Sequence, residues 1–300
     1  MRQRRHGRYD IPVTPNDQPD LPVPPVSVGM PVYNGEAFLV RALESVLAQT
    51  YTEFELIISD NASTDATPDI LRDYAARVAR IRYIRQAENI GVGKNHAFVA
   101  KQARGHLFKW VCADDELAPT LLADCVKVLQ DDPEVVLCCG RTQLIDMASN
   151  RLDVYGDDFD ALSADPLERY RIVRKQLKLC TSILAGVMRL DALKRCGYMA
   201  NYPHSDRVLM AGLALQGKLV LLPQVLFYYR WGRTVATPLK TRLELTQSFR
   251  PGAKRPAAFL TLRRRMAQMV MAWRVPRGWG GKIRSAWTAL RCTAWTGRRS

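Results

Sequence analysis

The stretch VSVGMPVYNGEAFLVRALESVLAQTYTEFELIISDNASTD (26–65) decides the fold class. It opens with a short apolar run, VSVGM (26–30), and a second apolar run, FELIIS (54–59), lies near its end. Between them, AFLVRALESVLAQ (37–49) repeats its apolar residues at helical spacing, so we expect a strand, a helix and a strand in that order. This order is typical of two parallel strands joined by a crossover helix.

The same alternation continues toward the middle of the chain. The expected elements are a helix over 65–79 capped by Ser63 or Thr64, a strand over 81–85, a helix over 94–103, a strand over 106–111, a helix over 120–129 and a strand over 135–140. Strands that alternate with helices predict an α/β fold with a doubly wound, mostly parallel sheet flanked by helices. Sheets of this kind bind ligands outside the carboxyl ends of their strands.

Polar loops follow three of the predicted strands: PVYNGE (31–36), DNASTD (60–65) and CADDE (112–116). We expect all three on one rim of the sheet. Asp114 and Asp115 in the third loop repel each other, and burying either costs several kcal/mol unless a cation compensates. Two interpretations stay open at this point: the pair holds a cation, or it supplies an N-cap and a first-turn acid for the helix that follows.

The distribution of charge and proline predicts the domain organisation. Residues 1–25 hold six of the 17 prolines and show no periodicity, so we predict a disordered leader. Residues 26–239 balance 25 Lys/Arg against 25 Asp/Glu, whereas residues 240–300 hold 15 Lys/Arg and a single acidic residue. We therefore expect a neutral body over 26–238 and a basic helical extension over 239–300.

The basic extension has an amphipathic pattern. One predicted helical face carries Phe259, Leu262, Met266, Met269, Val270 and Trp273. Basic helices with Trp on the apolar face suit a membrane interface, so one interpretation is that residues 240–300 bind an anionic membrane surface. The open alternative is that these helices pack on the body and expose their charges. No recognised nucleic-acid-binding module accompanies the charge, so we expect no nucleic acid partner.

Cysteine usage and hydropathy indicate the cellular compartment. The seven cysteines are odd in number and form no CxxC pair, which argues against a disulfide framework and a zinc site. No apolar stretch of roughly 7–15 residues follows the basic N-terminus, and no run reaches the roughly 18 apolar residues of a membrane span. We expect a cytoplasmic protein, placed peripherally on the inner face of the cytoplasmic membrane if the extension binds lipid.

Four stretches together resemble the inverting family 2 glycosyltransferases. They are 26–65, quoted above, NIGVGKNHAF (89–98), FKWVCADDELAP (108–119) and SDRVLMAGLALQG (205–217), in the family's order and at its spacings. The resemblance implies the GT-A fold. It also implies an enzyme that transfers a sugar from a nucleotide diphosphate sugar to an acceptor hydroxyl with inversion.

The resemblance assigns a donor site to the rim. Asp60 would accept a hydrogen bond from a uracil-like base, although it also suits an Asx turn before the next helix. Pro31, Tyr33 and Glu36 would form the first loop, with the Tyr33 ring beside the base and Glu36 at the ribose. Lys94 would meet the diphosphate at the start of a helix. The implied donor is a UDP-hexose.

The resemblance also implies a Mg²⁺ or Mn²⁺ ion that neutralises the leaving diphosphate. Asp114 matches the metal-binding aspartate of an Asp-any-Asp motif, with Asp115 in support. The motif's first aspartate is replaced by Cys112, and thiolates are poor ligands for hard cations. A further ligand, the histidine of an Arg-any-His turn, is replaced by Gly232. The expected ion would therefore have fewer protein ligands.

The family's catalytic base is the aspartate of a Glu-Asp pair at the head of a helix. In this chain Asp206 holds that position and Ser205 replaces the glutamate, while a plain first-turn acid is the alternative. His204 would line the acceptor site or have no role. The segment 181–197, with Gly186 and Arg189, would form a wall of the sugar pocket.

The acceptor itself is expected to be a glycan, a glycolipid or another cell-surface molecule. Two other classes stay open. One is a different nucleotide-using transferase, such as a nucleotidyltransferase; the other is a non-catalytic protein that retains the fold and binds membranes or polyanions. A nucleotidyltransferase should show a glycine-rich first loop that contains lysine, which 31–36 lacks in the needed form.

Overall fold

A computed structural model describes residues 23–155, 159, 161–176, 184–232 and 242–254. The predictions for most of the leader and for the amphipathic helices beyond residue 254 lie outside the described residues. In the part of the chain that is described, no helix is long and apolar enough to cross a membrane.

Strands and helices alternate along the first half of the chain, as the sequence predicts. The strands are β1 (Val26–Val32), β2 (Phe54–Asp60), β3 (Ile81–Arg85), β4 (Leu107–Trp110), β5 (Glu116–Leu117), β6 (Val135–Ile145), β7 (Arg151–Val154), β8 (Val187–Arg189) and β9 (Lys218–Arg230). The helices are α1 (Leu39–Leu47), α2 (Thr67–Arg77), α3 (Val92–Lys101), α4 (Leu121–Asp131), α5 (Pro166–Gln176), α7 (Leu190–Cys196), α8 (Ser205–Gln216) and α9 (Arg242–Phe249).

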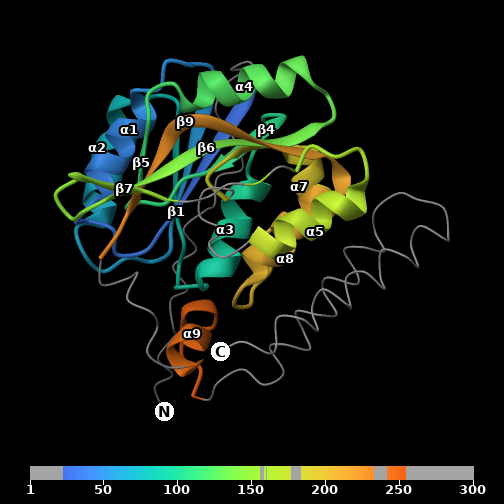
Figure 1. Ribbon diagram of the computed structural model, residues 1–300. Helices are drawn as coiled ribbons and strands as arrows, with labels where there is room; N and C mark the ends of the chain where they lie inside the picture. The colour runs from blue at the N-terminus through green and yellow to red at the C-terminus, as the bar shows by residue number, and fades with distance from the viewer. Residues whose placement is uncertain (1–22, 156–158, 160, 177–183, 233–241, 255–300) are drawn as a thin grey trace, which may run out of the picture.

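The strands form one sheet in the order β3-β2-β1-β4-β8-β6-β9-β5, and β7 pairs with β6 outside this path. β3, β2, β1 and β4 are parallel, and so are β6 and β9. β8 lies between these two groups and runs antiparallel to both β4 and β6. Helices cover both faces of the sheet (Figure 1), so the expected α/β architecture is confirmed.

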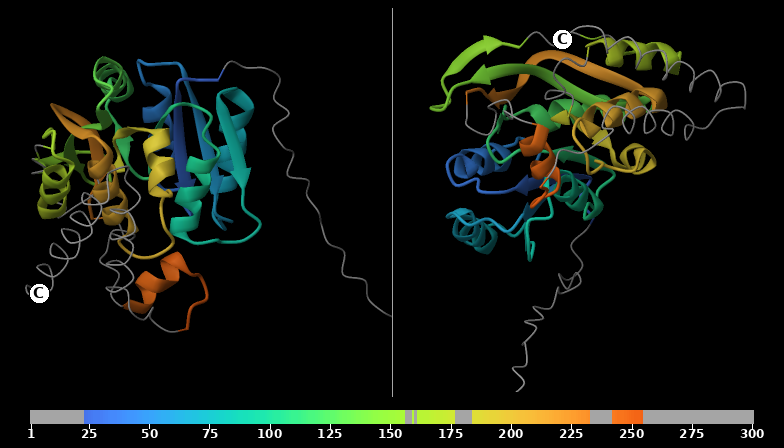
Figure 2. Two further views of the ribbon diagram at one scale, coloured as in Figure 1. Left: turned by 90° about the vertical axis from the view of Figure 1, so that its right-hand side faces the viewer. Right: turned by 90° about the horizontal axis from the view of Figure 1, so that it is seen from below.

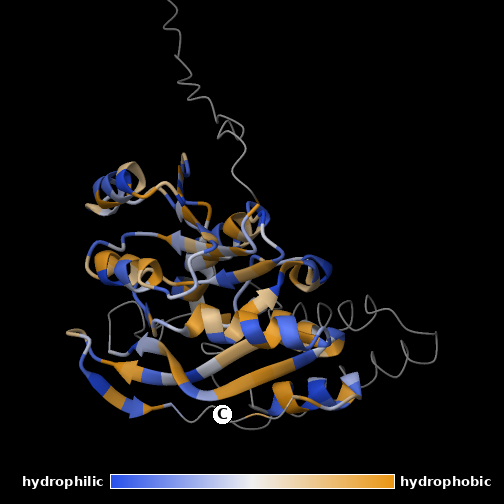
Figure 3. Cartoon of the chain, turned by 90° about the horizontal axis from the view of Figure 1, so that it is seen from above, coloured by the Kyte–Doolittle hydropathy of each residue, from blue (hydrophilic) through white to orange (hydrophobic). Residues whose placement is uncertain are grey.

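The sheet separates two apolar cores. One core gathers the inner faces of α1, α2 and α4, and the other gathers those of α3, α7 and α8. β2 supplies both cores because neighbouring side chains of a strand point to opposite faces: Leu56 and Ile58 belong to the first, Ile57 to the second. Figure 2 shows these layers, and Figure 3 shows apolar residues along the strands and on the helices that cover them.

Two local predictions were wrong. Pro31 is a buried residue of β1, where it pairs with Ser59, and is not part of the first loop. The first turn of α2 takes no side-chain cap from residue 63 or 64. Carboxylates bind its first N–H groups instead: Glu36 Oε2 accepts from the Ala66 N–H at 2.8 Å, and Asp65 Oδ1 accepts from the Thr67 N–H at 3.0 Å.

Candidate active site

Strand register brings the three predicted loops to one edge of the sheet. Val32 pairs with Asp60, and Asp60 pairs with Arg85, so β1, β2 and β3 end side by side. The loops that follow β1 and β2 and the loop from β4 to β5 therefore share the carboxyl rim. The first turn of α3 starts from the same rim.

Asp60 is fully buried at the end of β2, and both of its carboxylate oxygens have protein partners. Oδ1 accepts from the Ser63 N–H at 2.8 Å, which forms the Asx-type turn that the sequence had left open. Oδ2 accepts from Tyr83 Oη at 3.2 Å and from the Arg85 guanidinium at 2.9 Å. Arg85 is half-exposed and is a rim residue that sequence analysis missed.

The first loop is held against the start of α2. The Glu36 N–H donates to Asp65 Oδ2 at 3.1 Å, and the Glu36 carboxylate binds Ala66 as described above. Glu36 thus fixes the position of the loop, a role the sequence did not predict. Tyr33 is 49% exposed, so its ring is available to a ligand at the rim.

Lys94 lies in the first turn of α3 with an exposed side chain. This turn is tied to β2 by two amide side chains. Asn95 Nδ2 donates to the Ser59 carbonyl at 3.0 Å, and Asn61 Nδ2 donates to Asn89 Oδ1 at 2.8 Å. The structure thus holds a cation and a helix N-terminus at a fixed place on the rim, which is the arrangement that suits a phosphate.

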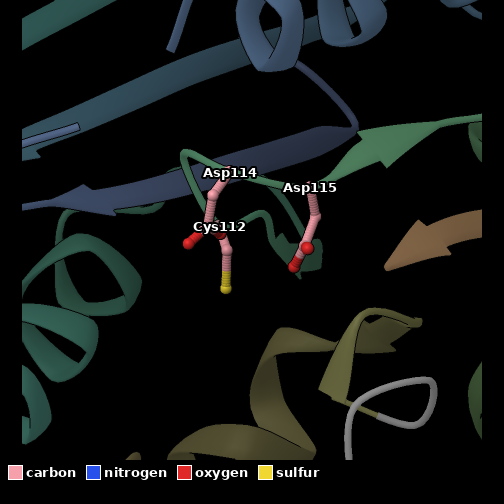
Figure 4. A group of neighbouring side chains, drawn as sticks. All are labelled: Cys112, Asp114 and Asp115. Atoms are coloured by element: carbon pink, nitrogen blue, oxygen red, sulfur yellow. The ribbon is translucent and has the colours of Figure 1, made fainter. Parts of the chain in front are cut away.

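Cys112, Asp114 and Asp115 lie together on the loop between β4 and β5. Their ligand atoms are all within 4.8 Å of one another, and Figure 4 shows the three side chains on the same side of the loop. Asp115 is buried, and burial raises its pKa to about 7, although Arg230 and Lys109 act against the rise. A buried carboxylate of this kind accepts a compensating cation readily.

Arg230 fixes this loop from the end of β9. Its side chain is fully buried and binds the Asp114 carbonyl at 2.9 Å, the Asp146 carbonyl at 2.6 Å and the Glu116 carboxylate. Its backbone N–H donates to Asp115 Oδ1 at 3.0 Å. Sequence analysis considered Arg230 only as part of the Arg-any-His turn, so it did not predict these contacts with the loop. Gly232, two residues later, takes a left-handed φ of 82°.

Lys109 is a second buried cation behind the loop and was not predicted from the sequence. It lies in β4, and its ammonium donates to the carbonyl of Ala185, just before β8. Burial lowers its pKa to about 8, and Asp115 is among the groups that act against this decrease. Lys109 and Arg230 therefore both stabilise the ionised form of Asp115.

The donor atoms of the loop fit a hard divalent cation in part. Asp114 and Asp115 offer carboxylate oxygens, the preferred ligands of Mg²⁺ and Mn²⁺. Cys112 offers a soft sulfur in the third position. The residues present therefore fit such an ion through two carboxylates, with other positions left to water or phosphate oxygens.

Asp206 is the second residue of α8, as the sequence predicts. The loop that leads to Asp206 packs on the first turn of α3, since a Cβ atom added to Gly93 would lie 2.9 Å from Asn201 Cα. Burial lowers the pKa of His96 on α3, and the carboxylate of Asp206 acts against that decrease. The His96 carbonyl in turn accepts from the indole N–H of Trp110, the last residue of β4, at 3.0 Å. His96 of α3 therefore lies between the charge of Asp206 and the end of the strand that leads into Asp114.

The residues before Asp206 have separate roles. Ser205, in the glutamate position, is buried, and its hydroxyl contacts Met199 Sδ at 3.3 Å. His204 is exposed at the N-cap with a left-handed φ of 62°. Arg189 does not face the rim: its guanidinium binds the carbonyls of Val135 at 2.8 Å and Leu129 at 2.6 Å, so its expected place in the sugar pocket was wrong.

Two curated relatives share the sequence pattern. A chondroitin synthase from Escherichia coli is 34% identical over 128 residues, which cover 43% of this chain and 18% of the relative. An uncharacterised protein from Mycobacterium tuberculosis is 32% identical over 204 residues, which cover 66% of this chain and 56% of the relative. The chain therefore spans about half, or less, of the length of these relatives.

Two solved structures share the fold. S. aureus TarS 1–349 in complex with UDP-GlcNAc is 17% identical with a TM-score of 0.65, over 91% of this chain and 73% of TarS. The mannosyltransferase PcManGT from Pyrobaculum calidifontis, in complex with GDP-Man and Mn²⁺, is 17% identical with a TM-score of 0.54, over 92% of this chain and 76% of its own.

The family itself follows from the sequence model described as Glycosyl transferase family 2. This model matches residues 27–190, more than half of the chain. The match contains the first, second and third rim loops together with Lys94, Asp114 and Asp115. With a GT-A fold and this match, the chain belongs to glycosyl transferase family 2.

Proposed function

We propose that this glycosyltransferase transfers a hexose from a UDP-sugar to a hydroxyl group of a glycan or lipid-linked acceptor, with inversion at the anomeric carbon. The observation that supports this most is the meeting of three elements at one rim. The base-binding candidate Asp60 and the carboxylate pair Asp114 and Asp115 lie at the carboxyl edge of the sheet, and the loop that leads to Asp206 packs on the start of α3 at the same edge.

Donor binding would use the rim loops in turn. Asp60 is held in place by Ser63, Tyr83 and Arg85. It would accept from the edge of a uracil through the lone pair of Oδ1 that these partners leave, and the half-exposed Arg85 beside it would offer a donor. The Tyr33 ring would cover the base, Glu36 would hold the loop at the ribose, and Lys94 would meet the diphosphate. TarS was solved with UDP-GlcNAc, which supports a UDP donor by analogy of fold.

In the transfer step, Asp206 takes the proton of the acceptor hydroxyl. The acceptor oxygen forms a bond to the anomeric carbon while the bond to the diphosphate oxygen breaks on the opposite side, and UDP leaves. A single displacement of this kind inverts the anomeric centre. Asp114, with Asp115, would hold Mg²⁺ or Mn²⁺, which neutralises charge on the leaving diphosphate when bound.

The basic residues 240–300 support a peripheral position on the inner face of an anionic membrane, close to a lipid-linked acceptor. Such a position would suit a role in polysaccharide biosynthesis. Deleting residues 255–300, which leaves α9 intact, should release the protein from anionic vesicles if this part of the proposal is right.

A panel of UDP-, GDP- and other nucleotide sugars with Mn²⁺ tests the function, scored by calorimetric binding, by slow donor hydrolysis and by NMR of the anomeric product. Binding of a UDP-sugar with an inverted product is the expected result. Tighter binding of ATP would favour a nucleotidyltransferase, and vesicle binding without any nucleotide binding would favour a non-catalytic protein. A retained configuration would contradict the inverting mechanism.

A further inference from the structure

The helix α9 contacts the turn that starts α3, although the two are far apart in sequence. Gly91 is the N-cap of α3 with a left-handed φ of 87°. A Cβ atom added to it would lie 2.2 Å from the carbonyl oxygen of Phe249, the last residue of α9. The two backbones therefore approach so closely that only glycine fits at position 91.

At Gly93 a third segment, the loop before α8, joins the contact between α3 and α9. A Cβ atom added there would lie 2.9 Å from the Ala200 oxygen, 2.9 Å from Asn201 Cα and 3.0 Å from Phe249 Cδ1. The start of α3 thus touches α9 on one side and the loop that leads into α8 on the other. Figures 1 and 2 both show α9 beside this end of α3, below the carboxyl edge of the sheet.

The two elements that meet at Gly93 carry different parts of the proposed chemistry. On α3, Lys94 is the residue after Gly93, and Asp206, in the first turn of α8, lies five residues after Asn201 of the loop before that helix. The α3 side is anchored to β2 by Asn95 and Asn61, whereas the loop before α8 includes His204 with its left-handed φ. Because Asn95 and Asn61 hold Lys94's turn to β2, we expect a change at this contact to move Asp206 more than Lys94.

We propose that α9 is a positioning element of the active site. Phe249, packed on Gly91 and Gly93, holds the loop of Ala200 and Asn201 against α3 and so fixes Asp206 relative to the bound donor. This inference rests on the proposed function. α9 is half-buried along this side, with Thr246 only 3% exposed, as expected of a docked helix.

Phe249→Ala and Gly93→Ala in the full-length chain test the inference. Both substitutions should lower the turnover rate, measured as the rate at which free UDP is formed from a saturating UDP-sugar, by about ten- to a hundredfold. Small misplacements of reacting groups are costly in rate. For Phe249→Ala the dissociation constant for UDP should change less than about threefold, because the donor contacts lie on the anchored side.

Gly105→Ala is the matched control. Its added Cβ would lie 2.9 Å from the Pro24 and Pro25 oxygens, as crowded as position 93 but away from the rim. It should lose comparable thermal stability and keep the wild-type rate. If Gly105→Ala lost as much rate as Gly93→Ala, or if Phe249→Ala kept the wild-type rate, the positioning role would be wrong.

Hydrogen exchange separates failure of this inference from failure of the proposed function. Phe249→Ala should speed amide exchange in residues 200–206, and it should do so without any ligand. Absence of UDP binding by the wild type would contradict the proposed function. Unchanged exchange in residues 200–206 would overturn the positioning role of α9, whether or not UDP binds.

Discussion

Arg230 donates its backbone N–H to Asp115 Oδ1 at 3.0 Å, so the end of β9 fixes the carboxylate that follows β4. The two residues are 115 positions apart in the chain. The Arg230 side chain adds bonds to the Asp114 carbonyl and the Glu116 carboxylate, and its guanidinium lies 4.6 Å from the centre of the Phe38 ring. Arg230 therefore binds the candidate metal loop at Asp114, Asp115 and Glu116.

Replacing this cation should be costly. Arg230→Met leaves the Glu116 carboxylate and two carbonyl groups without their donor, so we expect a loss of about 3–5 kcal/mol in the free energy of unfolding. Urea denaturation measures it. The control is Arg72→Met, which removes an ion pair with Asp69 whose side chains are 64% and 78% exposed; it should cost less than about 1 kcal/mol. Equal losses would contradict the supporting role of Arg230.

The metal loop predicts opposite effects of two substitutions. Asp114→Asn removes a hard ligand and should abolish Mn²⁺-dependent UDP binding, whereas Cys112→Asp replaces soft sulfur by oxygen and should tighten Mn²⁺ binding. Cys112→Ser should have little effect. Calorimetry with Mn²⁺ and UDP measures all three. If neither a chelator nor the Asp114→Asn substitution changed the activity, the metal-binding role of Asp114 would be excluded.

Asp115 predicts the pH dependence of metal binding. With a pKa of about 7 in the folded protein, the Asp115 carboxyl is mostly protonated below pH 7. It must lose this proton before it can bind a cation. Mn²⁺ affinity should therefore fall by about tenfold per pH unit below 7 and level off above it. Titrations between pH 5.5 and 8.5 test this. Asp115→Asn should flatten the profile, and a flat wild-type profile would contradict the assignment.

Asp60 predicts a nucleotide-specific effect. Asp60→Asn keeps the shape of the side chain but loses the charge that pairs with Arg85, so UDP should bind roughly 10–100-fold more weakly. Glu53→Gln, an exposed acid just before the opposite end of β2, is the control and should bind UDP normally. Thermal unfolding shows whether either variant is misfolded. Normal UDP affinity in a folded Asp60→Asn protein would remove Asp60 from the base site.

Periodicity was sufficient to predict the layered part of the fold. The strand over 81–85 matches β3, because its local apolar pattern determines it. The helix with Asp206 in its first turn has the position that the family resemblance implied. The sequence did not indicate that Lys109 and Arg230 are buried. Lys109 is buried where β8 pairs with β4, and Arg230 is buried at the end of β9, which pairs with β6 and β5; β8 and β9 both come from late in the chain.

Side-chain caps failed for a similar reason. Ser63 and Thr64 are good N-cap residues by type, yet one acceptor at the start of α2 comes from Asp65 and the other from Glu36, in another loop. The Glu36 contact is the one that sequence could not show. Such a contact depends on how the rim loops meet in space, and no local pattern encodes it. The same holds for Phe249, whose contact with Gly91 joins two distant segments.

The most direct test of the account is the turnover rate, measured as the rate at which free UDP is formed from a saturating UDP-sugar with Mn²⁺ and compared between the wild type and Asp206→Asn. Asparagine keeps the shape but cannot take the proton, so the rate should fall by roughly 10²–10⁴ while the dissociation constant for UDP stays unchanged. His204→Ala should cost far less. An Asp206→Asn enzyme with a near-normal rate would contradict the central claim that Asp206 is the catalytic base.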